Sequence, residues 1–316
     1  MNVILWHREM SDPAAFVREM TGNASLMEQL RAMPEATAGH SHTIQMFWHG
    51  PALSRMERLA IASFLHHGHP VDLYVYEEPA GVPRGACLRE AGEILPRDAL
   101  FTHRRTGSVA IFADWFRYRL LAERGGIWAD MDVACLRPIE YPQPEIFGWE
   151  DERQVNNAIL GLPPGHALAR WLADCCERPN RILPYDGWRT RLRKFRRRHL
   201  QGDRRERVRW GELGPKGLTA AARYLGYLDR ALPRTHFYPV KSEDWRVLFE
   251  PARGGLLPWG DESRAVHLWN NMTAQSANFN KNARFAAGSP FERLCERYGV
   301  TSDLSMRSTT GYSQKR

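Results

Sequence analysis

An α/β fold built on a parallel sheet is predicted by the order and spacing of the apolar residues. Residues from Thr43 to Trp48 are β-prone, residues 54–65 recur at helical spacing, and residues from Val71 to Tyr76 alternate as a second strand. A strand, a helix and a strand in this order form a βαβ unit, in which the two strands run parallel. The length of 316 residues and the hydrophobic content of 43% suffice for one enzyme-sized globular unit and exclude a disordered chain.

Three regions are expected along the chain. Residues 1–40 are expected to form an N-terminal helical lead-in, because their helical spacing continues until Pro34 interrupts it. Residues 41–285 are expected to form the main domain, with an arginine-rich insertion at residues 188–210. A C-terminal helix and a flexible tail are expected at residues 286–316.

Two carboxylates, Asp130 and Asp132, follow the next predicted helix. Ser108 is expected to cap this helix, which ends at Gly125, and the strand expected at residues 127–133 carries Asp130 and Asp132 near its carboxyl end. Open α/β sheets bind their ligands at that end. Two carboxylates one residue apart on an extended segment point to the same face and can share a hard divalent cation. A turn at the strand end or a helix cap is the alternative for such a pair.

Charge and cysteine content limit the partners and the compartment. The formal charge of +8 and the pI near 9.4 suit a polyanion, an anionic membrane surface or a small molecule that carries phosphate. Five cysteines without a CxxC pair suit reduced thiols better than a disulfide framework. No apolar run is long enough to span a membrane, and the first residues lack the features of a signal peptide. We therefore expect a cytoplasmic protein, at most peripheral to the inner face of the membrane.

The segment from Asp114 to Asp132, DWFRYRLLAERGGIWADMD, closely resembles the DXD-motif sugar-binding glycosyltransferases. The shared pattern is Asp-x-x-Arg, a helix, and then Gly-Gly-Ile-aromatic-x-Asp-x-Asp. This family has GT-A folds and includes α-1,4-galactosyl and α-1,4-N-acetylglucosaminyl transferases and glucosylating toxins. The resemblance extends from Thr43 to Asn271 and implies a GT-A fold, that is, a single nucleotide-sugar-binding α/β domain with helical insertions. The family often has Tyr where this chain has Trp128.

Four further segments match the family in order, and the resemblance implies roles for their residues. They are IQMFWHG at 44–50, NNAILG at 156–161, GPKGLT at 214–219 and AVHLWNN at 265–271. The implied catalytic residues are Asp130, Asp132, Asp114 and Arg117; the implied metal ligands are Asp132, Asp130 and His267; the implied donor-binding residues are Trp48, Trp128, Asn157, Trp269 and Asn270. Alternation along an extended strand would put His267 and Trp269 on one face. Ordinary core positions are the alternatives for Trp48 and His267, as is a local ion pair for Asp114 with Arg117.

The function implied is metal-dependent transfer of a hexose from a UDP- or GDP-sugar donor to a glycan or lipid-linked glycan acceptor, with retention of configuration and with Mn²⁺ or Mg²⁺ as cofactor. One alternative is an effector that modifies a protein acceptor. Another is a polyanion-binding or nucleic-acid-binding protein that uses the arginine-rich insertion, although no zinc spacing or RNA-binding signature accompanies it. The same insertion is a candidate basic amphipathic helix for peripheral contact with an anionic membrane, or a solvated charged helix.

Overall fold

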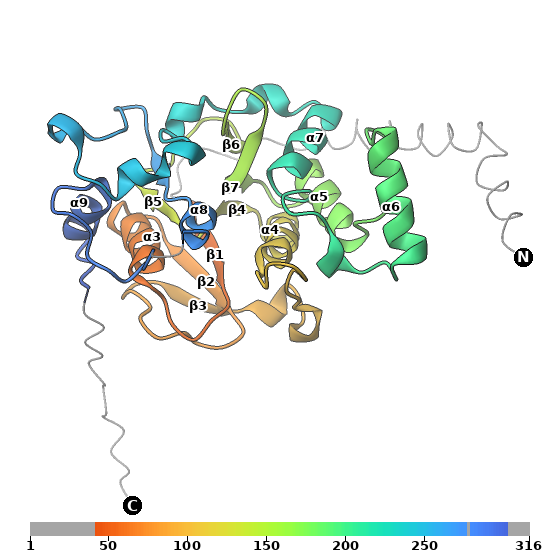
Figure 1. The fold of residues 1–316 in the computed structure, drawn as a ribbon, viewed down its shortest axis with the longest axis horizontal. Coiled ribbons are helices and arrows are strands. Elements are labelled where there is room, and N and C mark those ends of the chain that lie inside the picture. Colours follow the sequence, from red (N-terminus) through yellow and green to blue (C-terminus); the bar gives the residue numbers. More distant parts are fainter. Residues whose placement is uncertain (1–41, 277–278, 303–316) are drawn as a thin grey trace, which may run out of the picture. The chain divides into compact units, whose positions relative to one another are not determined.

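A six-stranded mixed sheet forms the centre of the fold in this computed structural model, which describes residues 42–276 and 279–302 (Figure 1). The strand order is β3-β2-β1-β4-β7-β6. Strands β1 to β4 run parallel, and β7 runs antiparallel to both of its neighbours. The strands are β1 Ile44–Trp48, β2 Val71–Val75, β3 Cys87–Glu90, β4 Gly126–Ala129, β6 Ile146–Trp149 and β7 Val155–Leu162.

Helices cover this sheet and connect its strands. They are α3 Arg55–His66, α4 Ala110–Arg124, α5 Ala167–Glu177, α6 Trp188–Leu200, α7 Pro215–Leu225, α8 Asn270–Ala274 and α9 Pro290–Arg297. Helix α4 packs on α5, and α7 packs on both α5 and β7. In Figure 1, α3 and α9 lie to the left of the central strands, and α4, α5 and α6 lie to the right. Of the helices in the described ranges, none combines the length and the apolar character that a membrane crossing requires.

The predicted α/β fold with a parallel-rich sheet is confirmed. β1, α3 and β2 form the expected βαβ unit, and Ser54 begins α3 with a capping box in which Glu57 takes part. Ser108 Oγ accepts a hydrogen bond of 3.1 Å from Ala110 N at the start of α4. The predicted N-terminal lead-in and the chain after residue 302 lie outside the described residues, and the arginine-rich stretch begins as helix α6.

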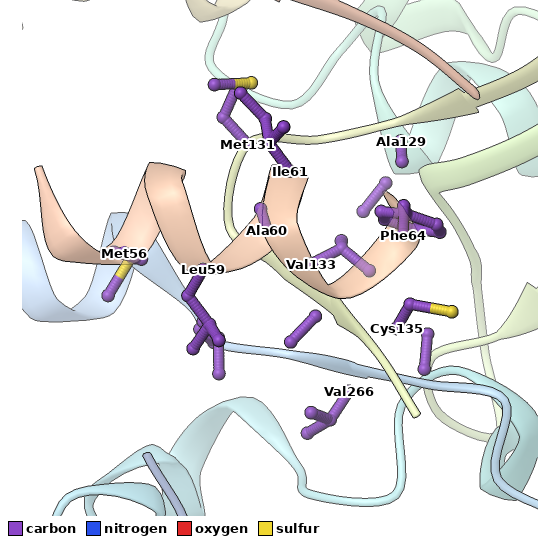
Figure 2. Packing of buried hydrophobic residues seen from close by; sticks show 14 of the residues in the cluster. Met56, Leu59, Ala60, Ile61, Phe64, Ala129, Met131, Val133, Cys135 and Val266 are labelled. Carbon is purple, nitrogen blue, oxygen red and sulfur yellow. The ribbon is translucent and has the colours of Figure 1, made fainter. Parts of the chain in front are cut away.

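A second, two-stranded sheet pairs two segments that lie far apart in the sequence. It pairs β5 Val133–Cys135 with β8 Ala265–His267 in antiparallel register, with Val133 opposite His267. Figure 2 shows Val133, Cys135 and Val266 of this sheet beside Phe64 and neighbouring side chains of α3. This packing holds β5 close to the end of β4.

The continuous strand predicted at residues 127–133 is wrong. β4 ends at Ala129, a turn follows, and the chain resumes as β5 at Val133 in the other sheet. Met131, between the two aspartates, enters the core beside Ile61 of α3 (Figure 2). Burial of this apolar side chain stabilises the turn, so that Asp130 and Asp132 follow the carboxyl end of β4, as expected, but on a bent backbone.

The extended alternation predicted from His267 to Trp269 is also wrong. β8 ends at His267, and Trp269 adopts a left-handed conformation with φ 57° and ψ 49° just before α8. The rings of the two residues nevertheless lie 4.2 Å apart between centroids. A turn, rather than strand periodicity, brings them together.

Gly125 ends α4 in a conformation that only glycine adopts readily, with φ 65° and ψ −157°. A Cβ atom at this position would lie 2.5 Å from the backbone nitrogen of Pro164. The carbonyl oxygen of Gly125 also accepts a hydrogen bond from the buried side chain of Gln45. The glycine therefore permits the tight passage from α4 into β4, the strand that leads to the two aspartates.

We expect Gly125→Ala to lower the free energy of unfolding by about 3 kcal/mol or more, because it adds a backbone clash to an unfavourable φ/ψ pair. Gly165→Ala is the matched control, since Gly165 also has positive φ, +73°, but has open space around an added Cβ. The control should cost only about 1 kcal/mol. Urea denaturation measures the free energy of unfolding of both variants, and equal losses would contradict the close approach of Gly125 to Pro164.

Candidate functional site

Asp130 and Asp132 lie in the turn from β4 to β5. The turn is closed by a hydrogen bond of 3.0 Å from Val133 N to Asp130 O, and Asp130 N donates to a carbonyl of β7 at 2.8 Å. Leu268 N donates to Asp132 O at 2.7 Å, which attaches the turn to the segment after β8. One ligand atom from each of Asp130, Asp132 and His267 thus lies within 4.8 Å of the others.

The hydrogen bonds of the two carboxylates leave one oxygen of each open. Asp130 Oδ1 accepts from Arg117 Nη2 at 2.6 Å and from Trp128 Nε1 at 2.7 Å. Asp132 Oδ2 accepts from Asn270 N at 2.7 Å and lies 3.2 Å from His267 Nε2. Within the described residues, no protein group bonds Asp130 Oδ2 or Asp132 Oδ1. Two carboxylates with free oxygens and an imidazole are a donor set that fits a divalent cation.

Burial and neighbouring charges give these groups different proton affinities. Burial raises the pKa of Asp130, and the negative charge of Asp132 adds to this rise against the opposing charge of Arg117. Burial also opposes ionisation of Asp132, but His267 and the amide of Asn270 together lower its pKa below the ordinary value. Burial would lower the pKa of His267, yet the charge and hydrogen bond of Asp132, together with the charges of Asp130 and Glu150, raise that pKa above its ordinary value. Asp132 with His267 thus has the character of a buried ion pair.

Arg117 connects three parts of the site. Its Nη2 lies 2.6 Å from Asp130 Oδ1 and 3.7 Å from Asp114 Oδ1, while its Nη1 donates to the carbonyl oxygen of Asn157 on β7. The guanidinium also lies over the Trp128 ring, 4.8 Å from its centroid. Only 4% of the Arg117 side chain is exposed, so these contacts are made away from water. The local ion pair considered for Asp114 and Arg117 is therefore only one edge of a larger buried cluster.

Asp114 is buried next to Arg117. Its Oδ1 accepts a hydrogen bond of 2.8 Å from Asn157 Nδ2, which also donates to Tyr118 Oη at 2.9 Å. A Cβ atom added to Gly214, the first residue of the GPKGLT segment, would lie 3.1 Å from Asp114 Oδ2. Burial raises the pKa of Asp114 to about 6, although Arg117 and Asn157 oppose the rise.

The predicted donor-binding residues fall into two groups. Trp128 and Asn157 are buried. Trp128 donates to Asp130, and Asn157 donates to Asp114 and Tyr118, so both contact the carboxylates from inside the protein.

Trp48 and Asn270 are half-buried, whereas Trp269 is buried with 5% exposed. Trp48 is half-buried at the carboxyl end of β1, which pairs with β4, and its Nε1 lacks a hydrogen-bond partner in the described part of the chain. Asn270 Oδ1 is likewise buried without a partner. The Trp269 ring lies tilted against the His267 ring, and its Nε1 donates to Val240 O at 3.1 Å.

The sequence reasoning missed four residues of this site. Tyr118 follows Asp114 by four positions on α4, and helical spacing alone would have placed it on the same face. Tyr238 packs its ring on His267 and Trp269, and its hydroxyl bonds the backbone of β7. Glu150 accepts from Asn156 at 2.9 Å, and Lys281 contributes positive charge near Asp132. Nothing local in the sequence marks these last three.

We expect Arg117→Met to lower the free energy of unfolding by about 3–5 kcal/mol, because it leaves Asp130 and Asp114 buried without their counter-charge. Arg119→Met is the control on the same helix, since Arg119 is half-buried, with 43% of its side chain exposed, and pairs with Glu123 and Glu177. That change should cost about 1 kcal/mol or less. A comparable loss in both variants, measured by chemical denaturation, would contradict the central place given to Arg117.

Asp114 predicts a specific pH dependence of stability. Its folded-state pKa of about 6 exceeds the value of about 3.9 in an unfolded chain, so this group stabilises the fold fully below about pH 4 and loses that contribution as the pH rises through 6. Asp114→Asn keeps an acceptor for Asn157 and removes the loss. Relative to the wild type, its free energy of unfolding should rise by about 2–3 kcal/mol from pH 4 to pH 7. A difference that stays flat with pH would rule out the raised pKa.

Two family models match this chain. Residues 99–153 match the glycosyltransferase sugar-binding region containing the DXD motif, and residues 206–299 match the α-1,4-glycosyltransferase conserved region. The first match contains Asp114, Arg117, Asp130 and Asp132, and the second contains His267 and the residues that follow it.

Curated relatives and a solved structure show similarity at low identity. Human α-1,4-N-acetylglucosaminyltransferase is 24% identical over 200 residues, which are 59% of this chain and 50% of that protein. Human lactosylceramide 4-α-galactosyltransferase is 25% identical over 198 residues, 58% of this chain and 48% of that protein. This chain thus spans about half the length of these relatives. The solved PaToxG glycosyltransferase aligns with a TM-score of 0.39 and 11% identity over 64% of this chain and 74% of that chain.

The two family-model matches confirm the resemblance inferred from the sequence: parts of the chain are similar to the DXD-motif sugar-binding region and to the α-1,4-glycosyltransferase conserved region.

Proposed function

We propose that this protein transfers a hexose from a nucleotide-sugar donor to an acceptor hydroxyl in a metal-dependent reaction. The observation that carries this proposal is the cluster of Asp130, Asp132 and His267, in which each carboxylate keeps an open oxygen at the end of β4. In open α/β sheets this edge is where ligands bind. The matches of both family models to the residues around the cluster support the same function.

Asp130, Asp132 and His267 would hold Mn²⁺ or Mg²⁺, which would offset the negative charge on a departing nucleoside diphosphate. The protein's own part is to fix the ligands before the donor binds. Arg117 and Trp128 hold one oxygen of Asp130, and the amide of Asn270 holds one oxygen of Asp132. A site that is already oriented reduces the reorganisation needed in the transition state.

The donor would be a UDP- or GDP-sugar that lies over the turn. Trp48 is suited to stack on the base, because its ring is half-buried at the same sheet edge. The unpaired Oδ1 of Asn270 is suited to accept from a donor hydroxyl, and Trp269 to cover the diphosphate. Asp114 and Arg117 would contact the sugar and the phosphate from the buried side of the site.

A glycan or lipid-linked glycan is the acceptor that we propose. One relative is named for α-1,4 transfer to lactosylceramide, a glycolipid, and another for α-1,4 transfer of N-acetylglucosamine. We further propose retention by front-face displacement: the anomeric carbon loses its bond to the phosphate oxygen, gains a bond to the acceptor oxygen, and the acceptor proton passes to the leaving phosphate. In this proposal Asp130 and Asp132 bind the metal and Asp114 is buried, so none of the three is the nucleophile that a covalent glycosyl-enzyme route would need.

A cytoplasmic location is the one that we propose for the enzyme. All five cysteines are free, and four of them are buried. Reduced thiols are the usual state in the cytosol.

The proposal is tested by a scan of UDP- and GDP-sugars with Mn²⁺, read by thermal shift and donor hydrolysis. One donor should raise the unfolding temperature only with metal present. Asp132→Asn should lower turnover by at least about 10²-fold, because it removes a charged ligand next to the reacting phosphates.

Asp229→Asn is the matched control, since Asp229 is exposed in the short 3-10 turn Leu228–Arg230 and is not part of the cluster. Its turnover should match that of the wild type. A donor response that is independent of metal, or full turnover in Asp132→Asn, would refute the assignment of the cluster.

A further inference from the structure

Helix α6, Trp188–Leu200, exposes a stripe of large apolar side chains. Trp188, Leu192 and Phe195 follow one another at spacings of four and three, so they lie on one face of the helix, and Leu200 is exposed at its end. Their exposed fractions are 70%, 53%, 43% and 73%. Folded chains normally scatter such residues over the surface, so a row of them on one helix marks a binding face.

Arginines border this stripe on both sides. Arg189 and Arg196 lie on one flank, Arg191 and Arg198 lie on the other, and all four are exposed. Within the described residues, none of the four takes part in an ion pair, and α6 contains no acidic residue. Their charges are therefore available to an anionic partner.

The opposite face of α6 is attached to the protein, which fixes the direction of the stripe. Lys194 Nζ lies 2.8 Å from Asp186 Oδ2, and Arg197 Nη2 lies 2.6 Å from Glu212 Oε1. Both cations are about 95% buried. Figure 1 shows α6 beyond α5, on the side of the fold away from α3.

We propose that α6 lies in the interface of an anionic lipid bilayer, with its apolar stripe among the acyl chains and its four flanking arginines on lipid phosphates. An exposed apolar face with flanking arginines is the pattern of interfacial helices. Nucleic acid would pair with the arginines but would leave Leu192 and Leu200 without an apolar environment. The bilayer satisfies both kinds of side chain at once.

A series of contacts links α6 to the candidate site. Glu212, the partner of Arg197, stands two residues before Gly214, and a Cβ at Gly214 would touch Asp114. The inference does not depend on sugar transfer, because membrane binding is measured without donor or metal.

The test is flotation of the full chain with vesicles of phosphatidylcholine, either alone or with about one third phosphatidylglycerol. The wild type should float only with the anionic vesicles. Leu192→Ser with Phe195→Ser should lower the partition coefficient by about tenfold or more, because it removes apolar groups that the bilayer would bury. Arg196→Gln with Arg198→Gln should lower it by about fivefold for each arginine and should weaken its dependence on salt.

Two controls complete the design. Leu256→Ser changes a leucine that is 78% exposed but lies outside α6, and it should leave the partition coefficient within about twofold. Leu192→Met with Phe195→Leu keeps an apolar stripe and should retain binding. Circular dichroism of each variant verifies the fold, which exposed substitutions should preserve.

Three outcomes would overturn the proposal. The first is flotation that is unaffected by the two serine changes. The second is RNA binding without flotation, lost in the arginine variants and kept in the serine variants, which would assign the face to nucleic acid. The third is a fall in molecular mass on size exclusion caused by the serine changes in a protein that does not float, which would assign it to a second copy of the chain.

Discussion

The site depends on one buried cation, Arg117. Its guanidinium is the counter-charge for Asp130 and Asp114, donates to the backbone of β7 and stacks on Trp128 of β4. It therefore joins α4, β4 and β7 at the point where the chain turns out of the sheet. Arginine suits this position better than lysine, because its planar group donates in several directions at once and stacks on an aromatic ring. A buried charge of this kind is tolerated only while all its partners remain in place.

Apolar packing, rather than the carboxylates themselves, explains why the turn persists. Asp130 and Asp132 repel one another when both are ionised, and burial increases the cost. Met131 between them is anchored in the core with α3, and Val133 continues directly into β5. The short sheet of β5 and β8 then brings His267 to the turn from far along the chain. Core packing thus stabilises an arrangement of charges that would be unfavourable alone.

Much of this arrangement could be predicted from the sequence because it depends on local signals. The Gly125 stop and the strand after it located the two aspartates at the end of β4, and the resemblance placed His267 beside them. The bend at Met131 was not predictable, because the residues of β4 and β5 are equally apolar and only their pairing with different strands separates them. Periodicity describes a regular strand and gives no sign of a change of sheet. Tyr238 and Lys281 join the site only through tertiary packing, for which no short pattern exists.

The pKa shifts in the site favour binding of a cation, as its geometry does. Burial raises the pKa of both Asp130 and Asp114, which means that each carboxylate ionises less readily here than in water. Arg117 and His267 are the cations that contact Asp130, Asp132 and Asp114 in the described residues, since the nearby Lys281 pairs with Glu57. Each of these three carboxylates keeps an oxygen that no described residue bonds. A divalent cation or the cationic part of a ligand would relieve this excess of negative charge. The open carboxylate oxygens at this sheet edge thus favour a partner that carries positive charge, while Arg117 fixes the other oxygen of Asp130.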